Sequence, residues 1–484
     1  MSRLQKFLSV VILFILISYE IIFAQVKTAK IDEFMSAMVE YQQFTGTILV
    51  AEKGKVIYKK GFGLANMDWD ISNVPDTKFR IGSITKQFVA MQIMQLVGEG
   101  KIKLDGKLSD YLPEYRKDTG EKITIHHLLT HTSGIPPYTG LPGFWSDSSR
   151  NSYDIDYMVK HFHSGDLEFE PGTQYKYNNS GYFLLAVIIE KVTGKSYEDN
   201  LKERILQPVK MNNTGVDRNQ RILEKRASGY YRHVNGYTNE PYFYMTNAMG
   251  AGDMYSTVED LYLWDQALYT EKLLSKKLKE KMFTPYLDNY AYGWSVRNVS
   301  LDKSTDSVKT ISHSGGINGF NTRIYRLVNN QHLVVVFNNT GGADLNGICE
   351  AVTDILYDRP YELPKRSITE VISKAIDENG VDSAIAQYRD LKVNHEDEYN
   401  FGEYELNRLG YQLLGMEKVD EAIKIFELNV EMFPEAFNPY DSLGEAYMIK
   451  GDKKLAIKNY AKSLELNPQN TNAIVMLSKI NKSK

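Results

Sequence analysis

A spacing of about 34 residues near the end of the chain most constrains how this sequence can fold. Residues of matching type recur at that interval in register: Leu409-Gly410 with Leu443-Gly444, Ala422 with Ala456, Phe426 with Tyr460, and Pro434 with Pro468. Small residues at fixed intervals let two antiparallel helices pack closely, and a proline ends each helix pair. The chain after about residue 362 is therefore predicted to be all-helical.

The register of this repeat resembles the tetratricopeptide repeat, whose unit is a helix pair of about 34 residues. Residues 368–395 are predicted to form a further helix pair with a weaker signature, and residues 471–480 a capping helix. The resemblance implies an all-α tetratricopeptide-repeat domain over residues 365–484. Such a domain can present a concave face to a protein partner, or it can merely extend the surface of the preceding domain.

Residues 30–360 mix strand-like and helix-like segments. One hairpin is predicted at each end of this region: residues 47–51 with 56–60, and residues 322–328 with 332–337. Residues 84–97 carry an apolar stripe at helical spacing, and Gly98 is expected to cap that helix. Strands at both ends with helices between them predict one mixed α/β domain whose two ends meet in a single sheet.

Residues 1–24 have the character of a secretory signal. Two basic residues precede an apolar stretch over residues 7–17, which is too short to span a bilayer comfortably, and Ala24 suits a cleavage point. An uncleaved membrane anchor is the alternative, although Glu20 argues against a deep span. We therefore expect an exported protein, either periplasmic or extracellular.

Charge and cysteine content exclude several classes of function. The net charge of -4 provides no electrostatic attraction to nucleic acid or to an anionic membrane. Cys349 is the only cysteine, so an internal disulfide and a Cys-rich zinc site are excluded. His126, His127 and His131 lie close together, but no Glu follows the first His as a zinc-peptidase motif requires. We expect no metal, no cofactor and no nucleic-acid partner.

Nucleophilic chemistry is indicated by Ser83 and Lys86 in the segment RIGSITK. Ser83 is expected where a helix begins, with Lys86 one turn later on the same face. A serine hydroxyl needs a base to become a nucleophile, and a desolvated lysine has a lowered pKa that suits this role. By itself the pattern also fits a Ser83 that only caps the helix.

Tyr177 and Asn179 form a second polar element, just before a helical run that ends at Gly194. From a loop, both side chains can point into one cleft. The phenol can carry a proton to a leaving group, and the amide can hold the lysine and the substrate carbonyl. An ordinary polar turn is the alternative.

His313, Gly315 and Gly316 form the third element, leading toward the second hairpin. On an edge strand the two glycines would let a substrate backbone approach closely. The N–H groups of Gly316 and Ser83 could form an oxyanion hole. His313 would contact the acyl or carboxylate end of the substrate.

Together the S-x-x-K, Y-x-N and H-x-G elements resemble the active-site set of serine β-lactamases, penicillin-recognising D,D-peptidases and related esterases. The Y-x-N form is similar to the class C branch. Segments such as ITIHHLLTHTSGIPPY and AMGAGDMYSTVEDLYLWDQAL extend the resemblance over roughly residues 35–360. It implies a β-lactamase-like domain over residues 30–360, with an antiparallel sheet flanked by helices and a helical subdomain. It also implies an acyl-enzyme on Ser83, proton transfer by Lys86 and Tyr177, and orientation of lysine and substrate by Asn179.

His313 departs from the family pattern, because a lysine usually stands there to hold a substrate carboxylate. Histidine is mostly neutral at pH 7, so we expect an esterase or D-amino-acid peptidase rather than a β-lactamase. The alternative function is a catalytically retired penicillin-binding-like protein that binds cell-wall fragments or peptides, with the repeats as its partner-binding module. A transacylase would use the same acyl-enzyme. Asp253 lies where relatives often have glycine, and the sequence assigns it no role.

Overall fold

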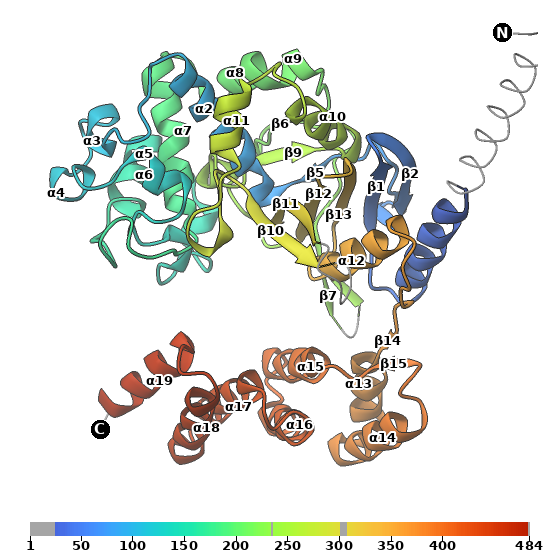
Figure 1. Ribbon diagram of the computed structural model, residues 1–484. Helices are drawn as coiled ribbons and strands as arrows, with labels where there is room; N and C mark the ends of the chain where they lie inside the picture. Colours follow the sequence, from blue (N-terminus) through green and yellow to red (C-terminus); the bar gives the residue numbers. More distant parts are fainter. Residues whose placement is uncertain (1–24, 234–235, 301–306, 483–484) are drawn as a thin grey trace, which may run out of the picture. The chain divides into compact units, whose positions relative to one another are not determined.

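A computed structural model describes residues 25–233, 236–300 and 307–482, and the chain divides into two units (Figure 1). Of the described residues, the first unit contains 25–232 and 237–362, and the second contains 233, 236 and 363–482. The predicted signal, residues 1–24, lies outside the described residues. Within the described part of the chain, no helix has the length and apolar character needed to cross a bilayer.

The first unit is built on a six-stranded antiparallel sheet with the strand order β10-β11-β12-β13-β1-β2. Its strands are β1 (Gly46–Glu52), β2 (Lys55–Phe62), β10 (Ser295–Ser300), β11 (Ser307–Ile317), β12 (Phe320–Leu327) and β13 (His332–Asn338). Both predicted hairpins are confirmed, as β1–β2 and β12–β13. Strand β1 also pairs with β13 along its length, so the two ends of the unit meet in one sheet, as predicted.

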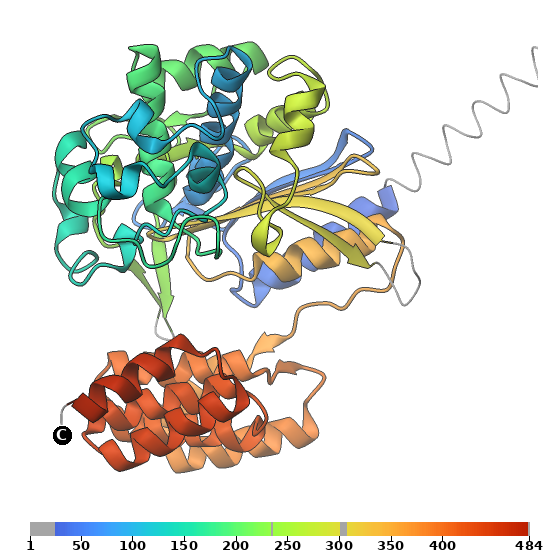
Figure 2. The same ribbon diagram turned by 60° about the vertical axis from the view of Figure 1, so that its left-hand side comes forward.

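Helices cover both faces of this sheet (Figures 1 and 2). Successive strand residues point to opposite faces, and β13 is buried on both. Val334 and Val336 pack with the helix over residues 25–40 and with α12 (Leu345–Leu356). Val335 and Phe337 belong to a second core on the other face, together with α2 (Thr85–Gly98) and α10 (Val258–Leu268). The site elements lie on the α2 side.

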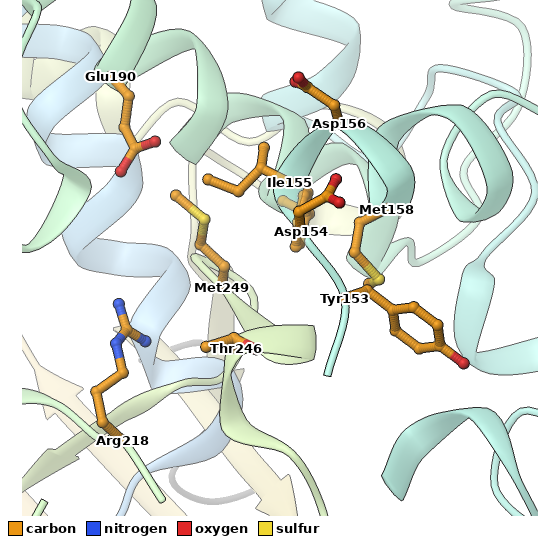
Figure 3. Close-up of a pocket in the computed structure, with 10 residues that line it drawn as sticks. Tyr153, Asp154, Ile155, Asp156, Met158, Glu190, Arg218, Thr246 and Met249 are labelled. Carbon is orange, nitrogen blue, oxygen red and sulfur yellow. The ribbon is translucent and has the colours of Figure 1, made fainter. Parts of the chain in front are cut away.

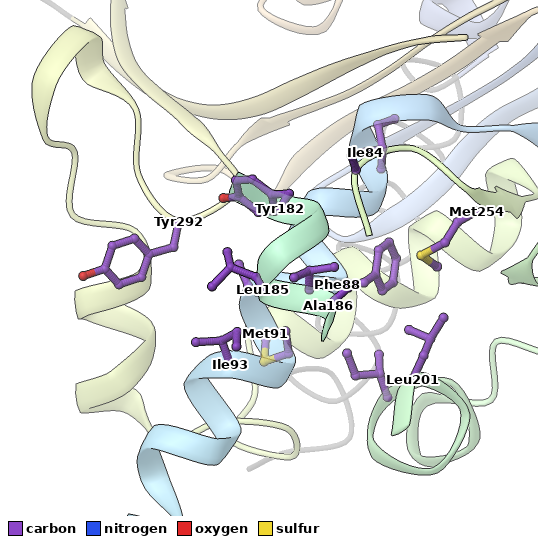
Figure 4. Close-up of a cluster of buried hydrophobic side chains, with 14 of the residues drawn as sticks. Ile84, Phe88, Met91, Ile93, Tyr182, Leu185, Ala186, Leu201, Met254 and Tyr292 are labelled. Carbon is purple, nitrogen blue, oxygen red and sulfur yellow. The ribbon is translucent and has the colours of Figure 1, made fainter. Parts of the chain in front are cut away.

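The remaining helices build a helical subdomain around α7 (Asn179–Thr193), whose residues from Ser180 to Ile189 are all buried. The other helices are α3 (Leu108–Tyr111), α4 (Lys117–Gly120), α5 (Ile125–Leu129), α6 (Ile155–Phe162), α8 (Tyr197–Leu201), α9 (Gln207–Val209) and α11 (Lys276–Met282). Figure 4 shows the core that α2 and α7 share, with Phe88 and Met91 beside Leu185 and Ala186. Residues Thr85 to Met94 of α2 are all buried as well, so α2 and α7 lie at the centre of this layer.

The second unit consists of successive helices: α13 (Ile368–Asn379), α14 (Val381–Asn394), α15 (Glu403–Gly415), α16 (Val419–Met432), α17 (Phe437–Lys450), α18 (Lys453–Leu466) and α19 (Thr471–Lys482). The predicted extra pair, α13–α14, and the predicted last helix, α19, are both present. A Cβ on Gly410 would lie 2.4 Å from the Phe426 ring, so the recurring glycine permits close packing of α15 and α16. The expectation of an all-helical segment misses one feature, a two-residue parallel pairing of β14 (Arg366–Ser367) with β15 (Tyr399–Asn400).

Candidate active site

Ser83 lies in a short 3-10 turn, Gly82–Ile84, that leads directly into α2. Ile81, the residue just before this turn, is held at both of its backbone polar groups. Its N–H donates to Met254 O at 2.9 Å, and its carbonyl accepts from Thr322 Oγ1 at 2.9 Å. Ile84 occupies the N-cap position of α2, so the alternative in which Ser83 only caps the helix is wrong. The Ser83 hydroxyl is therefore not occupied as a helix cap and can serve as a nucleophile at the entrance to α2.

Lys86 is fully buried, and its Nζ contacts three oxygen atoms. These are Ser83 Oγ at 2.9 Å, Asn179 Oδ1 at 2.8 Å and the Ala251 carbonyl at 2.7 Å. All three are uncharged groups, so nothing among them offsets the cost of burying an ammonium ion. Burial lowers the pKa of Lys86 well below its ordinary value of 10.5.

These contacts match a neutral amine. Amide and carbonyl oxygens only accept hydrogen bonds, so the two N–H groups of a neutral Lys86 are directed to Asn179 and Ala251. The remaining lone pair then faces Ser83 Oγ. This is the arrangement that a general base needs, with the acceptor nitrogen at hydrogen-bond distance from the hydroxyl that it deprotonates.

Tyr177 and Asn179 flank Asn178, the residue just before α7. Asn178 is the N-cap of that helix: its Oδ1 accepts from Gly181 N, and its own N–H donates to His131 Nδ1 at 3.1 Å. Lys86 Nζ lies 4.9 Å from the centre of the Tyr177 ring. Desolvation raises the pKa of the Tyr177 phenol, and a hydrogen bond with Ser83 opposes that shift. Tyr177 thus remains a protonated phenol beside the nucleophile.

His313 uses both of its ring nitrogens within the protein. Nδ1 lies 2.6 Å from the Ser314 carbonyl, which can only accept, so Nδ1 carries the proton. Nε2 therefore accepts from the Tyr290 hydroxyl at 2.9 Å. Burial lowers the pKa of His313 to about 3. The imidazole is neutral and presents no free donor to a ligand.

The two glycines of β11 differ in what surrounds them. A Cβ on Gly315 would lie 1.9 Å from Ile81 O, so glycine at this position lets β11 approach the turn that carries Ser83. A Cβ on Gly316 would meet nothing within 4 Å, so that position opens onto free space. A Cβ on Gly82 would lie 2.7 Å from Gly316 N, which places this N–H next to the nucleophile turn. The structure thus brings every residue of the three predicted elements to one place.

Sequence reasoning missed three contributors to this site. His131 is buried, and its ring centre lies 4.3 Å from that of Tyr177. Tyr290 binds His313, and the Ala251 carbonyl binds Lys86. The sequence pattern around His131 suggests only a metal ligand, and no spacing in the sequence connects His131 with Tyr177. A backbone acceptor such as Ala251 has no side-chain signature at all.

Cys349 does not compete as a nucleophile. It lies in α12 on the opposite face of the sheet, fully buried, and burial raises its pKa to about 12. In the described residues, no three or more His, Cys, Asp and Glu side chains gather as a group that could hold a metal ion.

Comparison with known proteins places these features in a family. The β-lactamase family model matches residues 30–351, and the tetratricopeptide-repeat model matches residues 438–470. Penicillin-binding protein 4* of Bacillus subtilis is 32% identical, over 73% of this chain and 81% of that protein. The teichoic acid D-alanine hydrolase of Staphylococcus aureus is 28% identical, over 69% of this chain and 79% of that protein.

Among solved structures, the octameric penicillin-binding protein homologue from Pyrococcus abyssi is similar, with a TM-score of 0.60 and 29% identity. The match covers 72% of this chain and 81% of that one. It supports the mixed α/β fold with an antiparallel sheet that the sequence predicts. The chain therefore belongs to the β-lactamase family, as a serine hydrolase related to the penicillin-binding proteins that carries a C-terminal tetratricopeptide repeat.

Proposed function

We propose that the chain hydrolyses an ester or amide through an acyl-enzyme on Ser83. The observation that carries this proposal is the set of contacts around Lys86 Nζ. A buried amine with two obligate acceptors on its N–H groups has its lone pair left for the serine hydroxyl 2.9 Å away. Such an amine can deprotonate the serine by itself, with no histidine or carboxylate needed to assist it.

In the proposed reaction Lys86 takes the Ser83 proton while Oγ bonds to the carbonyl carbon. The N–H groups of Ser83 and Gly316 receive the developing oxyanion. The bond to the leaving group then breaks, and the Tyr177 hydroxyl gives that group its proton. The proton held by Lys86 restores the phenol, so the acyl-enzyme forms with every group back in its starting state. Water repeats these steps in place of Ser83, releases the acid and frees the serine.

We further propose that the preferred substrates lack a carboxylate at the position that faces β11. A neutral His313 whose nitrogens bind Ser314 and Tyr290 supplies no cation for such a carboxylate. This favours simple esters and D-aminoacyl esters or amides over β-lactams and peptides that end in D-alanine. The relative named teichoic acid D-alanine hydrolase supports the same direction.

The proposal is tested by comparing the mature protein with its Ser83→Ala variant on a short-chain p-nitrophenyl ester. We expect turnover in the wild type and none above background in the variant. D-alanine esters, D-alanyl-D-alanine peptides and a chromogenic cephalosporin then rank the substrate classes. Equal behaviour of both preparations on every compound would reject hydrolysis and favour the retired, ligand-binding alternative.

The remaining assignments are also proposals. We assign catalysis to residues 30–360 and a partner-binding role to the tetratricopeptide segment, residues 365–484. We also assign residues 1–24 as an export signal, which places the enzyme in the periplasm or outside the cell. Mass spectrometry of the secreted protein tests the last point, because a mature N-terminus at Gln25 is expected.

A further inference from the structure

Asp253 is a fully buried carboxylate two residues after the Ala251 carbonyl that binds Lys86. We propose that Asp253 is a positioning residue, which closes the turn Gly250–Asp253 and thereby holds the Ala251 carbonyl on Lys86. This inference rests on the proposed function, since it concerns the residue that activates Ser83.

The turn is closed by the Asp253 side chain itself. Oδ1 accepts a hydrogen bond from Gly250 N at 3.0 Å, which joins the two ends of the four-residue segment. Ala251, inside the segment, directs its carbonyl to Lys86 Nζ at 2.7 Å. Gly250 has a φ of +67°, a conformation that glycine adopts readily and side-chain-bearing residues rarely do, so a glycine here lets the chain turn. The N–H groups of Ala251 and Gly252 add two hydrogen bonds to the Ala248 carbonyl, at 2.9 and 2.8 Å.

The same segment touches the nucleophile turn. A Cβ on Gly252 would lie 3.6 Å from the Gly82 carbonyl carbon. Met254, the residue after Asp253, accepts from Ile81 N at 2.9 Å and donates to Thr85 Oγ1 at 3.2 Å. Residues on both sides of Ser83 are therefore tied to the segment that Asp253 closes, and a displaced turn would move Lys86 and Ser83 relative to each other.

Arg218 holds the carboxylate from the other side, with Nη1 3.3 Å from Asp253 Oδ2. Its side chain is 26% exposed and lines a 440 Å³ pocket at the start of α6 (Figure 3). Burial raises the pKa values of the Tyr138 and Tyr197 phenols, and the charge of Asp253 adds to both shifts. Burial raises the pKa of Asp253 to about 7, against the opposing effect of Arg218.

A purely structural ion pair elsewhere in the same unit offers a matched control. Asp265 on α10 is as deeply buried as Asp253 and binds Arg326 at 2.6 Å. Its side chain accepts hydrogen bonds from Arg326 and Gln266, neither of which lies in the segment that carries Ala251. Loss of Asp265 leaves the buried Arg326 without its carboxylate, whereas Arg218 keeps Glu198 at 3.8 Å when Asp253 is lost. Each alanine variant therefore breaks a buried ion pair and loses stability, while only Asp253→Ala is expected to change acylation.

The experiment measures the rate at which a fluorophosphonate probe labels Ser83, together with kcat and KM on the p-nitrophenyl ester. The variants are Asp253→Ala, Asp253→Asn and Asp265→Ala, each assayed at a temperature at which tryptophan fluorescence shows it to be folded. For Asp253→Ala we expect labelling and kcat to fall roughly 10- to 100-fold with KM nearly unchanged, because misplacement of a catalytic group by about 1 Å costs on the order of 100-fold. Asp253→Asn should recover most of the rate, since its amide oxygen can accept from Gly250 N.

Asp265→Ala should label at the wild-type rate. Wild-type labelling in the folded Asp253→Ala variant, or an equal loss in both alanine variants, would overturn this inference and leave the proposed function intact. A wild-type protein that the probe does not label at Ser83 would overturn the proposed function, and this inference with it.

Discussion

Replacement of Lys86 by methionine tests the protonation state on which the catalytic role of this residue depends. Methionine matches the length of the buried chain but cannot titrate. In the folded protein Lys86 is fully buried among uncharged partners, which lowers its pKa well below 10.5. In the unfolded chain it is exposed to water and has its ordinary pKa. Over the pH range between these two values, the unfolded wild type binds one proton more than the folded wild type.

The sign and size of the effect follow from that proton. Stability rises with pH wherever the unfolded state binds more protons, by about 1.4 kcal/mol per pH unit for one proton. Every other titrating group is common to both proteins, so the difference between their free energies of unfolding isolates Lys86. Relative to Lys86→Met, the wild type should gain stability with this slope as the pH rises from the folded pKa of Lys86 toward 10.5. The gain ends near 10.5, where the unfolded lysine also loses its proton.

Urea unfolding followed by tryptophan fluorescence provides the assay. All of the tryptophans belong to the first unit: Trp69, Trp145, Trp264 and Trp294. The last two are fully buried, so their emission reports the unfolding of the catalytic unit without interference from the repeats. A free-energy difference that stays constant with pH would mean that Lys86 is charged in the folded protein. Its role as the base would then be wrong.

Other substitutions separate the remaining parts of the argument. Tyr177→Phe should slow the hydrolysis of an alkyl ester by roughly 100-fold or more. The hydrolysis of a p-nitrophenyl ester should slow less, because p-nitrophenolate leaves without a proton. Equal losses on the two esters would contradict proton donation by the phenol. Gly315→Ala should lower the free energy of unfolding by about 1–3 kcal/mol, because its Cβ would lie 1.9 Å from the Ile81 carbonyl oxygen. Gly316→Ala, whose Cβ meets nothing within 4 Å, should change the free energy of unfolding by no more than about 0.5 kcal/mol, and the fluorescence assay measures both variants. Gly410→Ala should destabilise the second unit by about 1–3 kcal/mol, because its Cβ would collide with the Phe426 ring. Hydrogen exchange of α15 and α16 measures this loss, and the control is Gly415→Ala, whose Cβ meets nothing within 4 Å.

Features that repeat along the chain were predictable because each depends on local pattern. The 34-residue interval predicts α15 to α18, and pairs of strand-like segments joined by short turns predict the hairpins β1–β2 and β12–β13. The pairing of β1 with β13 was also predictable, since strands at both ends of a mixed domain have few other partners. The β14–β15 pairing was not, because two residues are too short to carry a strand pattern.

The residues of the active site also fall into those that the sequence predicts and those that it does not. Side chains in recognisable spacing, such as Ser83 with Lys86, could be found from sequence. The contacts that set their chemistry could not, because they join residues far apart in the chain through backbone atoms. Lys86 meets the carbonyl of Ala251, 165 residues later, and Asn178 fixes the loop of Tyr177 through the ring of His131. The sequence predicts that His313 contacts the acyl or carboxylate end of a substrate. It gives no sign that the ring nitrogens bind Tyr290 and Ser314, as they do in the structure.

Taken together, the shifted pKa values leave the centre of the site without a formal charge. Burial lowers the pKa values of Lys86, His131 and His313, and desolvation raises that of Tyr177, so each shift favours the neutral form of its group. A neutral site binds a neutral acyl group without the desolvation cost that a buried ion would impose. Charge then develops only in the transition state, on the oxyanion and on the protonated lysine, and both form side by side. Their mutual attraction in a poorly solvated site is absent from the ground state, which is the kind of interaction that accelerates a reaction rather than merely tightening binding.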